Sequence, residues 1–197
     1  MIRLVTFAAA LLFAGAAQAH TFGAHGAGFI AGFAHPLGGF DHLLAMIAVG
    51  LWAAQLGGRA LWAVPAAFVG AMAVGSVAGL TGYELSGLEQ AIAVSVLILG
   101  LVIAAALRMR TDLAAMLVGA FAICHGIAHG AELPEAAAPV GYAVGFMLAT
   151  ALLHGVGICL GLLSAHKLGA DRFGRYAIRA AGVAIAVAGV YLTVPLV

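Results

Sequence analysis

Residues 35–57 read HPLGGFDHLLAMIAVGLWAAQLG, a polar turn sequence followed at once by an apolar run of membrane-spanning length. The apolar character begins earlier, because residues 26–34 are also apolar or small. One straight helix over residues 26–57 would be about 48 Å long, which exceeds the ~30 Å of a bilayer's hydrocarbon core. Pro36 disfavours helix at the residue before it. We therefore predict a short helix near residues 26–34, a break at residues 35–39 and a membrane span from about Phe40.

The composition is that of an integral membrane protein. Of the 197 residues, 65% are hydrophobic and 8% are charged, whereas a soluble domain carries about 25% charged residues. Six apolar runs approach the ~20 residues that a helix needs to cross a bilayer, and they cover residues 40–57, 60–81, 87–107, 112–131, 139–164 and 174–195. The predicted fold class is therefore an all-α membrane protein, a bundle of six transmembrane helices in lipid. The net charge of +1, with no basic patch, argues against nucleic acid as a partner.

The first 19 residues have the parts of a secretory signal peptide. MIR supplies the positive start, LVTFAAALLFAGA the apolar core, and AQA a small-residue cleavage site. We expect cleavage after Ala19, which divides the chain into a signal peptide (residues 1–19) and a six-helix transmembrane domain (residues 20–197). An uncleaved signal anchor is the alternative.

The charged residues indicate how the bundle is oriented. With six spans after a cleaved signal, the loops on one side contain Arg59, Arg108, Arg110, Lys167, Arg172, Arg175 and Arg179. The loops on the other side contain Glu84, Glu89, Glu132 and Glu135, and neither Lys nor Arg. Basic loops stay in the cytoplasm. We therefore predict a multi-pass protein of the bacterial inner membrane, with both mature termini in the periplasm.

Ionisable residues within the spans need an explanation, since each costs on the order of 2.5–3.5 kcal/mol at the centre of a membrane helix. The first group is His35, Asp41 and His42. Neighbouring residues of a helix point about 100° apart. We therefore expect one of Asp41 and His42 to bind a ligand while the other supports it.

The second group lies in CHGIAHGAE, residues 124–132. His125, His129 and Glu132 are spaced to share one helix face, and two imidazoles with a carboxylate form half of a transition-metal shell. The pair resembles half of the HExxH motif, but it lacks the internal Glu that a metalloprotease needs. The third group is His154, one turn after Thr150 and about 22 Å along its predicted helix from Pro139. This depth suits a second binding site along a transport path.

His20 and His25 precede the predicted spans, and we count them with the candidate metal ligands. If His20 is the mature N-terminus, its amine and imidazole could chelate a metal together, while a frayed terminus is the alternative. For the whole constellation, the alternative is hydrogen-bonded packing of buried histidines. Two mixed groups of histidine and carboxylate at similar depth favour metal handling over packing.

Several of these stretches resemble the HupE/UreJ family of membrane proteins. They are AQA before His20, GFAHPLGGFDHLLAMIAVGLWAA (residues 32–54), CHGIAHGAE and ATALLHG (residues 149–155), and the resemblance extends over the mature chain. It implies a nickel permease that accompanies hydrogenase or urease. Its first metal site would be His35, Asp41 and His42, with His125, His129 and Glu132 as further ligands. The first segment is also similar to a nickel/cobalt permease signature, but five residues, not four, separate His35 from Asp41.

The predicted function is uptake of a divalent transition metal, Ni²⁺ or Co²⁺, with the ion as substrate and no permanently bound cofactor. The chain has no Walker A motif, so it cannot itself hydrolyse ATP, and we expect a permease, not an enzyme. One alternative is an intramembrane zinc-dependent hydrolase, although no serine lies near the histidine groups in the sequence. Another is a haem protein with paired axial histidines. Assembly as a homo-oligomer stays open.

Overall fold

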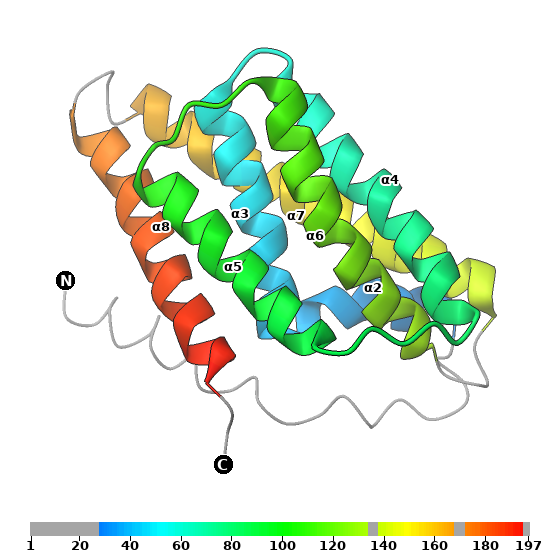
Figure 1. Cartoon of the computed structure of the whole chain (residues 1–197). Helices are drawn as coiled ribbons and strands as arrows, with labels where there is room; N and C mark the ends of the chain where they lie inside the picture. Colours follow the sequence, from blue (N-terminus) through cyan, green and yellow to red (C-terminus); the bar gives the residue numbers. More distant parts are fainter. Residues whose placement is uncertain (1–27, 134–137, 168–171, 195–197) are drawn as a thin grey trace, which may run out of the picture.

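The computed structural model of the chain describes residues 28–133, 138–167 and 172–194, and every regular element in these ranges is a helix (Figure 1). The helices are α2 (Phe29–Gly38), α3 (Phe40–Leu56), α4 (Ala60–Leu80), α5 (Leu88–Ala104), α6 (Thr111–Ala131), α7 (Pro139–Lys167) and α8 (Arg172–Thr193). The predicted signal peptide lies outside the described residues. Cleavage after Ala19 therefore stays a prediction.

The helices coincide closely with the apolar runs of the sequence. The largest differences are at α5, which ends at Ala104 and not at residue 107, and at α7, which continues to Lys167. The tight turn from α3 to α4 explains why α3 ends and α4 begins where they do. Gly57 and Gly58 have φ of 72° and 52°, which only glycine adopts without strain. The Gly57 N–H donates to the carbonyl of Ala53 and closes α3.

Four helices are long and apolar enough to cross a membrane: α4, α6, α7 and α8. The pair α2–α3 would add a fifth span, and α5 is a shorter apolar helix of 17 residues. Large apolar side chains, including Trp62, Met116 and Val187, are exposed on the outside of the bundle. Such an apolar surface is favourable against lipid, whereas its exposure to water costs free energy. The chain is thus a helical membrane protein, and the count of six spans stays a prediction.

The break before α3 is sharper than the sequence predicts. α2 does not end near residue 34; it continues through His35 and Pro36 to Gly38, and α3 begins at Phe40. Gly39 alone is extended, with φ −92° and ψ 115°, and the two helices meet at 85°. Proline removes one helical hydrogen bond, yet its fixed φ is helical. The short α2 therefore tolerates Pro36 for a last turn, and His35 lies on a helix, not in the break.

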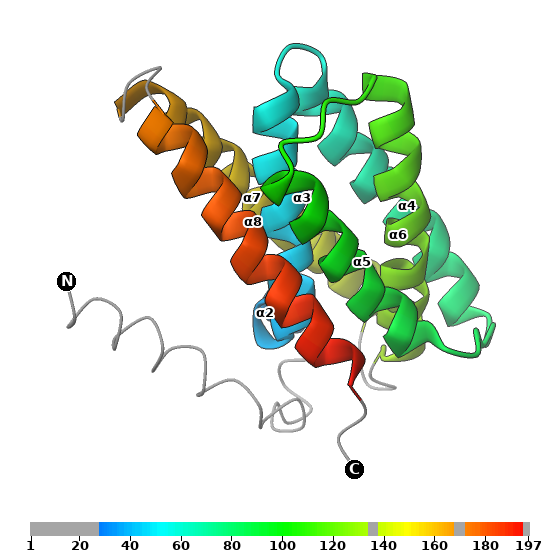
Figure 2. The ribbon, with the colours of Figure 1, turned by 60° about the vertical axis from the view of Figure 1, so that its left-hand side comes forward.

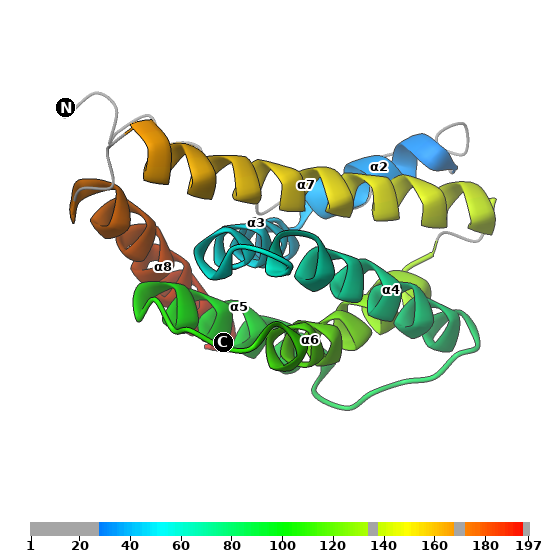
Figure 3. The same ribbon diagram turned by 90° about the horizontal axis from the view of Figure 1, so that it is seen from above.

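α3 is the central helix of the bundle. Viewed from above, α7 and α2 form one row, α3 and α4 a second, and α5 and α6 a third (Figure 3). α8 closes one side and packs mainly along α5 (Figure 2). The middle of α3, from Ala45 to Ala53, is buried except for the partly buried Ile47. At the start of α3, His42 is also buried, whereas Phe40, Asp41, Leu43 and Leu44 are partly exposed.

Glycines set the closest helix contacts. A Cβ on Gly75 of α4 would collide with the carbonyl of Ile123 on α6, and one on Gly126 would collide with the carbonyl of Met72. The same holds between α3 and α7 at Gly50 and Gly157. Small residues allow such close approach in lipid, where packing and not water exclusion holds helices together. The backbones of α4 and α6, and of α3 and α7, are therefore firmly paired.

The two ends of the bundle differ in charge. We call the lower end in Figure 1 the α2 end; it holds α2 and the loop from α4 to α5. The other is the Arg end, with the α3–α4 and α5–α6 turns and with Arg59, Arg108 and Arg110. The α2 end carries Glu84, Glu89 and Glu132. The separation of charge expected from the sequence is thus present in the fold.

Candidate functional site

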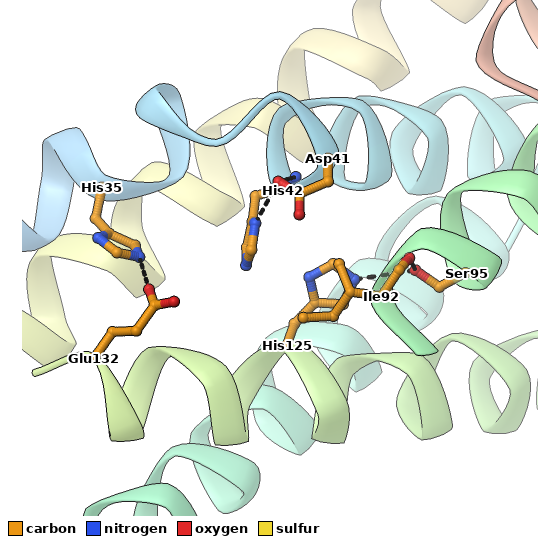
Figure 4. A network of polar contacts seen from close by, with 7 residues as sticks. All are labelled: His35, Asp41, His42, Ile92, Ser95, His125 and Glu132. Carbon is orange, nitrogen blue, oxygen red and sulfur yellow. Dashed lines mark hydrogen bonds and ion pairs between the residues drawn. The ribbon is translucent and has the colours of Figure 1, made fainter. Parts of the chain in front are cut away.

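Four imidazoles gather inside the α2 end, and we call His35, His42, His125 and His129 the histidine cluster. The ring centre of His42 lies 4.9 Å from that of His125 and 4.6 Å from that of His129. The ring of His35 lies 4.8 Å from His129 and 6.3 Å from His42. The fold therefore brings the two sequence motifs face to face, one from α2 and α3 and one from α6 (Figure 4).

Asp41 fixes the orientation of His42. Its Oδ1 accepts the backbone N–H of His42 at 2.7 Å and faces the imidazole Nδ1 at 2.8 Å. A proton on Nδ1 leaves the lone pair on Nε2, and this nitrogen is buried without a partner. Figure 4 shows the ring pointing away from α3 towards α6. Asp41 thus supports His42, and binding of a ligand by His42 stays a prediction.

Ser95 of α5 orients His125 in the same way. The Ser95 hydroxyl donates to the carbonyl of Ile92 at 2.7 Å, and it lies 3.1 Å from His125 Nε2. Because the single hydroxyl proton of Ser95 is donated to the Ile92 carbonyl, the hydroxyl oxygen can only accept a hydrogen bond from His125 Nε2. The free lone pair of His125 is then on Nδ1, which is buried and has no partner. No serine lies near the histidine groups in the sequence, but the fold brings Ser95 of α5 against His125 of α6.

His129 has no polar partner for either ring nitrogen and is fully buried. Its ring stacks on Phe146 of α7, with 4.9 Å between centres and 23° between planes. Together with the nitrogens of His42 and His125, this gives four orphan imidazole nitrogens at one place. Buried polar atoms are normally hydrogen-bonded. These four nitrogens are not, which argues against hydrogen-bonded packing as the role of the histidines.

His35 and Glu132 form the outer edge of the site. His35 Nε2 lies 3.1 Å from Glu132 Oε2, with 27% and 52% of the two side chains exposed. The hydrogen bond from His35 lowers the pKa of the Glu132 carboxyl, although burial opposes this. The carboxylate is therefore held in its charged form where the cluster reaches the surface.

His154 lies apart from the cluster, further along α7 towards the Arg end. Both of its nitrogens are buried without partners. Its ring meets Phe68 of α4 edge to face at 5.1 Å, and Phe68 in turn lies 5.6 Å from His125. Thr150, one turn earlier, is buried and contacts the sulfur of Met72 at 3.9 Å. His154 is thus connected to the cluster through one aromatic ring.

Two comparisons identify the family of the chain. The family model described as HupE / UreJ protein matches residues 8–192. The chain belongs to the HupE/UreJ family. Protein HupE of Rhizobium leguminosarum bv. viciae is 45% identical over 192 residues, which cover 98% of this chain and 97% of that protein. No solved structure matches the chain.

The geometry of this HupE/UreJ protein differs from a finished metal site. Within residues 28–133, 138–167 and 172–194, no three His, Cys, Asp or Glu side chains converge tightly enough to hold an ion as they stand. The rings of the cluster pack edge to face or tilted, except that His129 lies flat on Phe146. His20 and His25 lie outside the described residues. Their role, and metal binding by the other seven candidates, stay predictions.

Sequence reasoning missed four residues at this site in the HupE/UreJ fold: Ser95, Phe68, Phe146 and Tyr142, whose ring lies 5.8 Å from that of His35. Tyr142, Phe146, Thr150 and His154 follow one another at intervals of four along α7, a spacing that places them on one side of the helix. That pattern was visible in the sequence. The contacts of Ser95 and Phe68 were not, since both are single residues in apolar runs.

Proposed function

We propose that this HupE/UreJ protein carries a divalent transition-metal ion, Ni²⁺ with Co²⁺ as a related substrate, through the cytoplasmic membrane into the cell. The orphan nitrogens of His42, His125 and His129 carry the proposal. A buried polar atom without a partner costs about 1–3 kcal/mol. A fold that keeps four together is explained by a ligand that satisfies them, and a metal ion does so.

The donor set suits a borderline dication. Neutral imidazole binds nickel, copper and zinc. Asp41 and Glu132 supply two negative charges beside the cluster, which offset the charge of the ion in a medium of low dielectric. Because imidazole alone does not distinguish these metals, nickel rests on the family, whose members are regarded as nickel permeases that accompany hydrogenase or urease.

The route follows from the predicted topology. Six spans with both mature termini outside would place the α2 end in the periplasm and the Arg end in the cytoplasm. The ion would enter between His35 and Glu132, exchange waters for the imidazoles of the cluster, and continue to His154. His20 and His25 precede α2 and would capture ions first. A membrane potential favours entry by about 2.3 kcal/mol per charge per 100 mV, so no nucleotide is needed.

Loading the cluster requires rings to rotate. Asp41 holds His42 and Ser95 holds His125, whereas His129 has no polar partner and only ring contacts. We infer that His129 turns from Phe146 to complete the coordination. The ligands so obtained come from α3 and α6, with His35 of α2 within reach.

An enzyme is the weaker hypothesis, because the HupE/UreJ match gives no support to the zinc-dependent hydrolase and Ser95 is not placed as a nucleophile. A hydrolase that used Ser95 as nucleophile would need the histidine to accept the serine proton. Here the hydroxyl is engaged with the carbonyl of Ile92. This geometry orients His125 and does not activate the serine.

Uptake of radioactive nickel tests the proposal in cells that lack other nickel importers. We expect His42→Ala to reduce uptake to the level of cells without the protein. Asp112→Asn, which removes the ion pair with Arg110 at the Arg end, is the control and should transport normally. Wild-type uptake by the His42→Ala variant at equal protein abundance would overturn the proposed site. Competition by unlabelled Co²⁺ then tests the second substrate.

A further inference from the structure

Phe68 separates the two groups of histidines. It is fully buried, and its ring contacts His125 on one side and His154 on the other. The planes differ by 52° and 86°, so the ring meets His154 edge to face. A metal–imidazole bond is about 2 Å long. An ion bound at His125 therefore cannot also reach His154 while this ring stands between them.

His154 offers the next resting place for an ion beyond that ring. Its two nitrogens are buried and unpartnered. Thr150 and Met72, which contact each other beside it, are also fully buried. Phe68 itself has no lone pair, and the face of its ring attracts cations only weakly. An ion would thus pause on either side of Phe68 and not at it.

The backbones next to this ring are fixed unequally. His154 stands on a fixed part of α7, because a Cβ on Gly50 of α3 would collide with the His154 carbonyl. The half of α4 near the α2 end is fixed to α6 in the same way at Gly75 and Gly79. Phe68 precedes that half and follows Pro65, which lies within α4. Proline cannot donate the hydrogen bond to the carbonyl of Leu61, and it weakens the helix at this point.

We propose that Phe68 is the gate of the transport path, a ring that blocks transfer from the histidine cluster to His154 until the Pro65 segment of α4 moves. This inference rests on the proposed function, since it assigns a rate-controlling residue to the same path. Gating steps of this kind set the turnover of many proteins. Phe68 supplies no ligand to the ion, so it should control how fast the ion crosses more than how tightly the cluster holds it.

Two substitutions test the gate, one that makes the side chain at position 68 smaller and one that makes it larger. Phe68→Leu removes the flat ring and should raise the maximal rate of nickel uptake, by about threefold to tenfold if the gate limits turnover. Phe68→Trp enlarges it and should lower that rate at least about tenfold. Neither substitution removes a ligand of the cluster, so the fold-change in the Ni²⁺ Kd of the purified protein should be smaller than the fold-change in the maximal uptake rate. Phe121→Leu, a half-buried phenylalanine on α6, is the matched control and should change neither quantity.

The outcomes separate the gate from the transport function. An increase with leucine and a decrease with tryptophan support the gate, because a misfolded variant cannot transport faster than wild type. Uptake that is unchanged or reduced in both variants, at equal protein abundance, overturns it. If the His42→Ala variant keeps wild-type uptake, the proposed function fails instead, whatever the Phe68 variants do.

Discussion

The carboxylate of Asp41 and the imidazole of His42, neighbours in the chain, face each other at 2.8 Å. The same oxygen also accepts the His42 backbone N–H at 2.7 Å. These two contacts hold the ring towards α6 and leave Nε2 as the free nitrogen. Carboxylates that orient a ligating histidine in this way raise its basicity and fix its tautomer.

Replacement of Asp41 should therefore weaken metal binding without emptying the cluster of ligands. We expect Asp41→Asn to lower the Ni²⁺ affinity of the purified protein about 10-fold to 100-fold, as loss of such supporting groups does elsewhere. Calorimetric titration measures the effect. Asp112→Asn, which removes the ion pair with Arg110 at the opposite end, is the control. Equal affinities of the Asp41 variant and wild type would show that Asp41 is not a supporting group.

Ser95 makes a similar prediction for His125. Ser95→Ala removes the acceptor for the Nε2 proton and frees the ring to change tautomer. We expect nickel affinity to fall about tenfold, near the lower end of such effects. Ser164→Ala removes a hydroxyl that donates to the Leu160 carbonyl of its own helix, and the variant should bind nickel normally. If both serine variants bind alike, the contact with His125 has no role in ligation.

His154 should matter for transport but not for capture. In the His154→Ala variant we expect nickel uptake to fall at least about tenfold, because the ion loses its next ligand along the path. Equilibrium binding at the cluster should stay the same, since Phe68 separates the two. A parallel loss of binding and uptake would place His154 within the first site, contrary to the structure.

The pairing of α4 with α6 predicts a specific loss of stability. Gly75→Ala puts a methyl group against the Ile123 carbonyl and should destabilise the protein by about 1–3 kcal/mol. Gly70→Ala on the same helix meets nothing within 4 Å, and it should be neutral or slightly stabilising. Thermal unfolding in detergent compares them. Equal midpoints for the two variants would contradict the close contact of these helices.

The contact between His35 and Glu132 predicts how stability depends on pH at the outer edge of the site. The pKa of Glu132 is lowered from its ordinary value of 4.5. A lowered pKa in the folded protein means that the contact stabilises the fold above pH 4.5. The benefit disappears as the pH falls through the lowered value. The gap in unfolding midpoint between wild type and Glu132→Gln should narrow as the pH falls below about 4.5 and close in more acidic buffer. A gap that persists at pH 3 would rule out this carboxylate as its source.

Much of the fold was predictable because a bilayer leaves few choices. Apolar runs of spanning length must be helices, since every backbone group needs an internal partner. The helix limits in the sequence and in the structure therefore agree closely, as they do for α4 and α6. The break at Pro36 was less well predicted, because a proline near the end of a short helix costs one hydrogen bond and does not dictate where the helix ends.

By itself, the sequence determined which ionisable groups the apolar helices carry and how those groups are spaced. The helical spacing places His125, His129 and Glu132 on one face. The ionisable residues of the apolar runs fall in a few short groups. The tertiary structure decided which groups meet. The 85° turn at Gly39 brings His42 over α6, and the packing of α5 and α4 adds Ser95 and Phe68 to the histidines. The physical reason is that spacing along a helix fixes the direction of a side chain, whereas its neighbours depend on how distant helices pack.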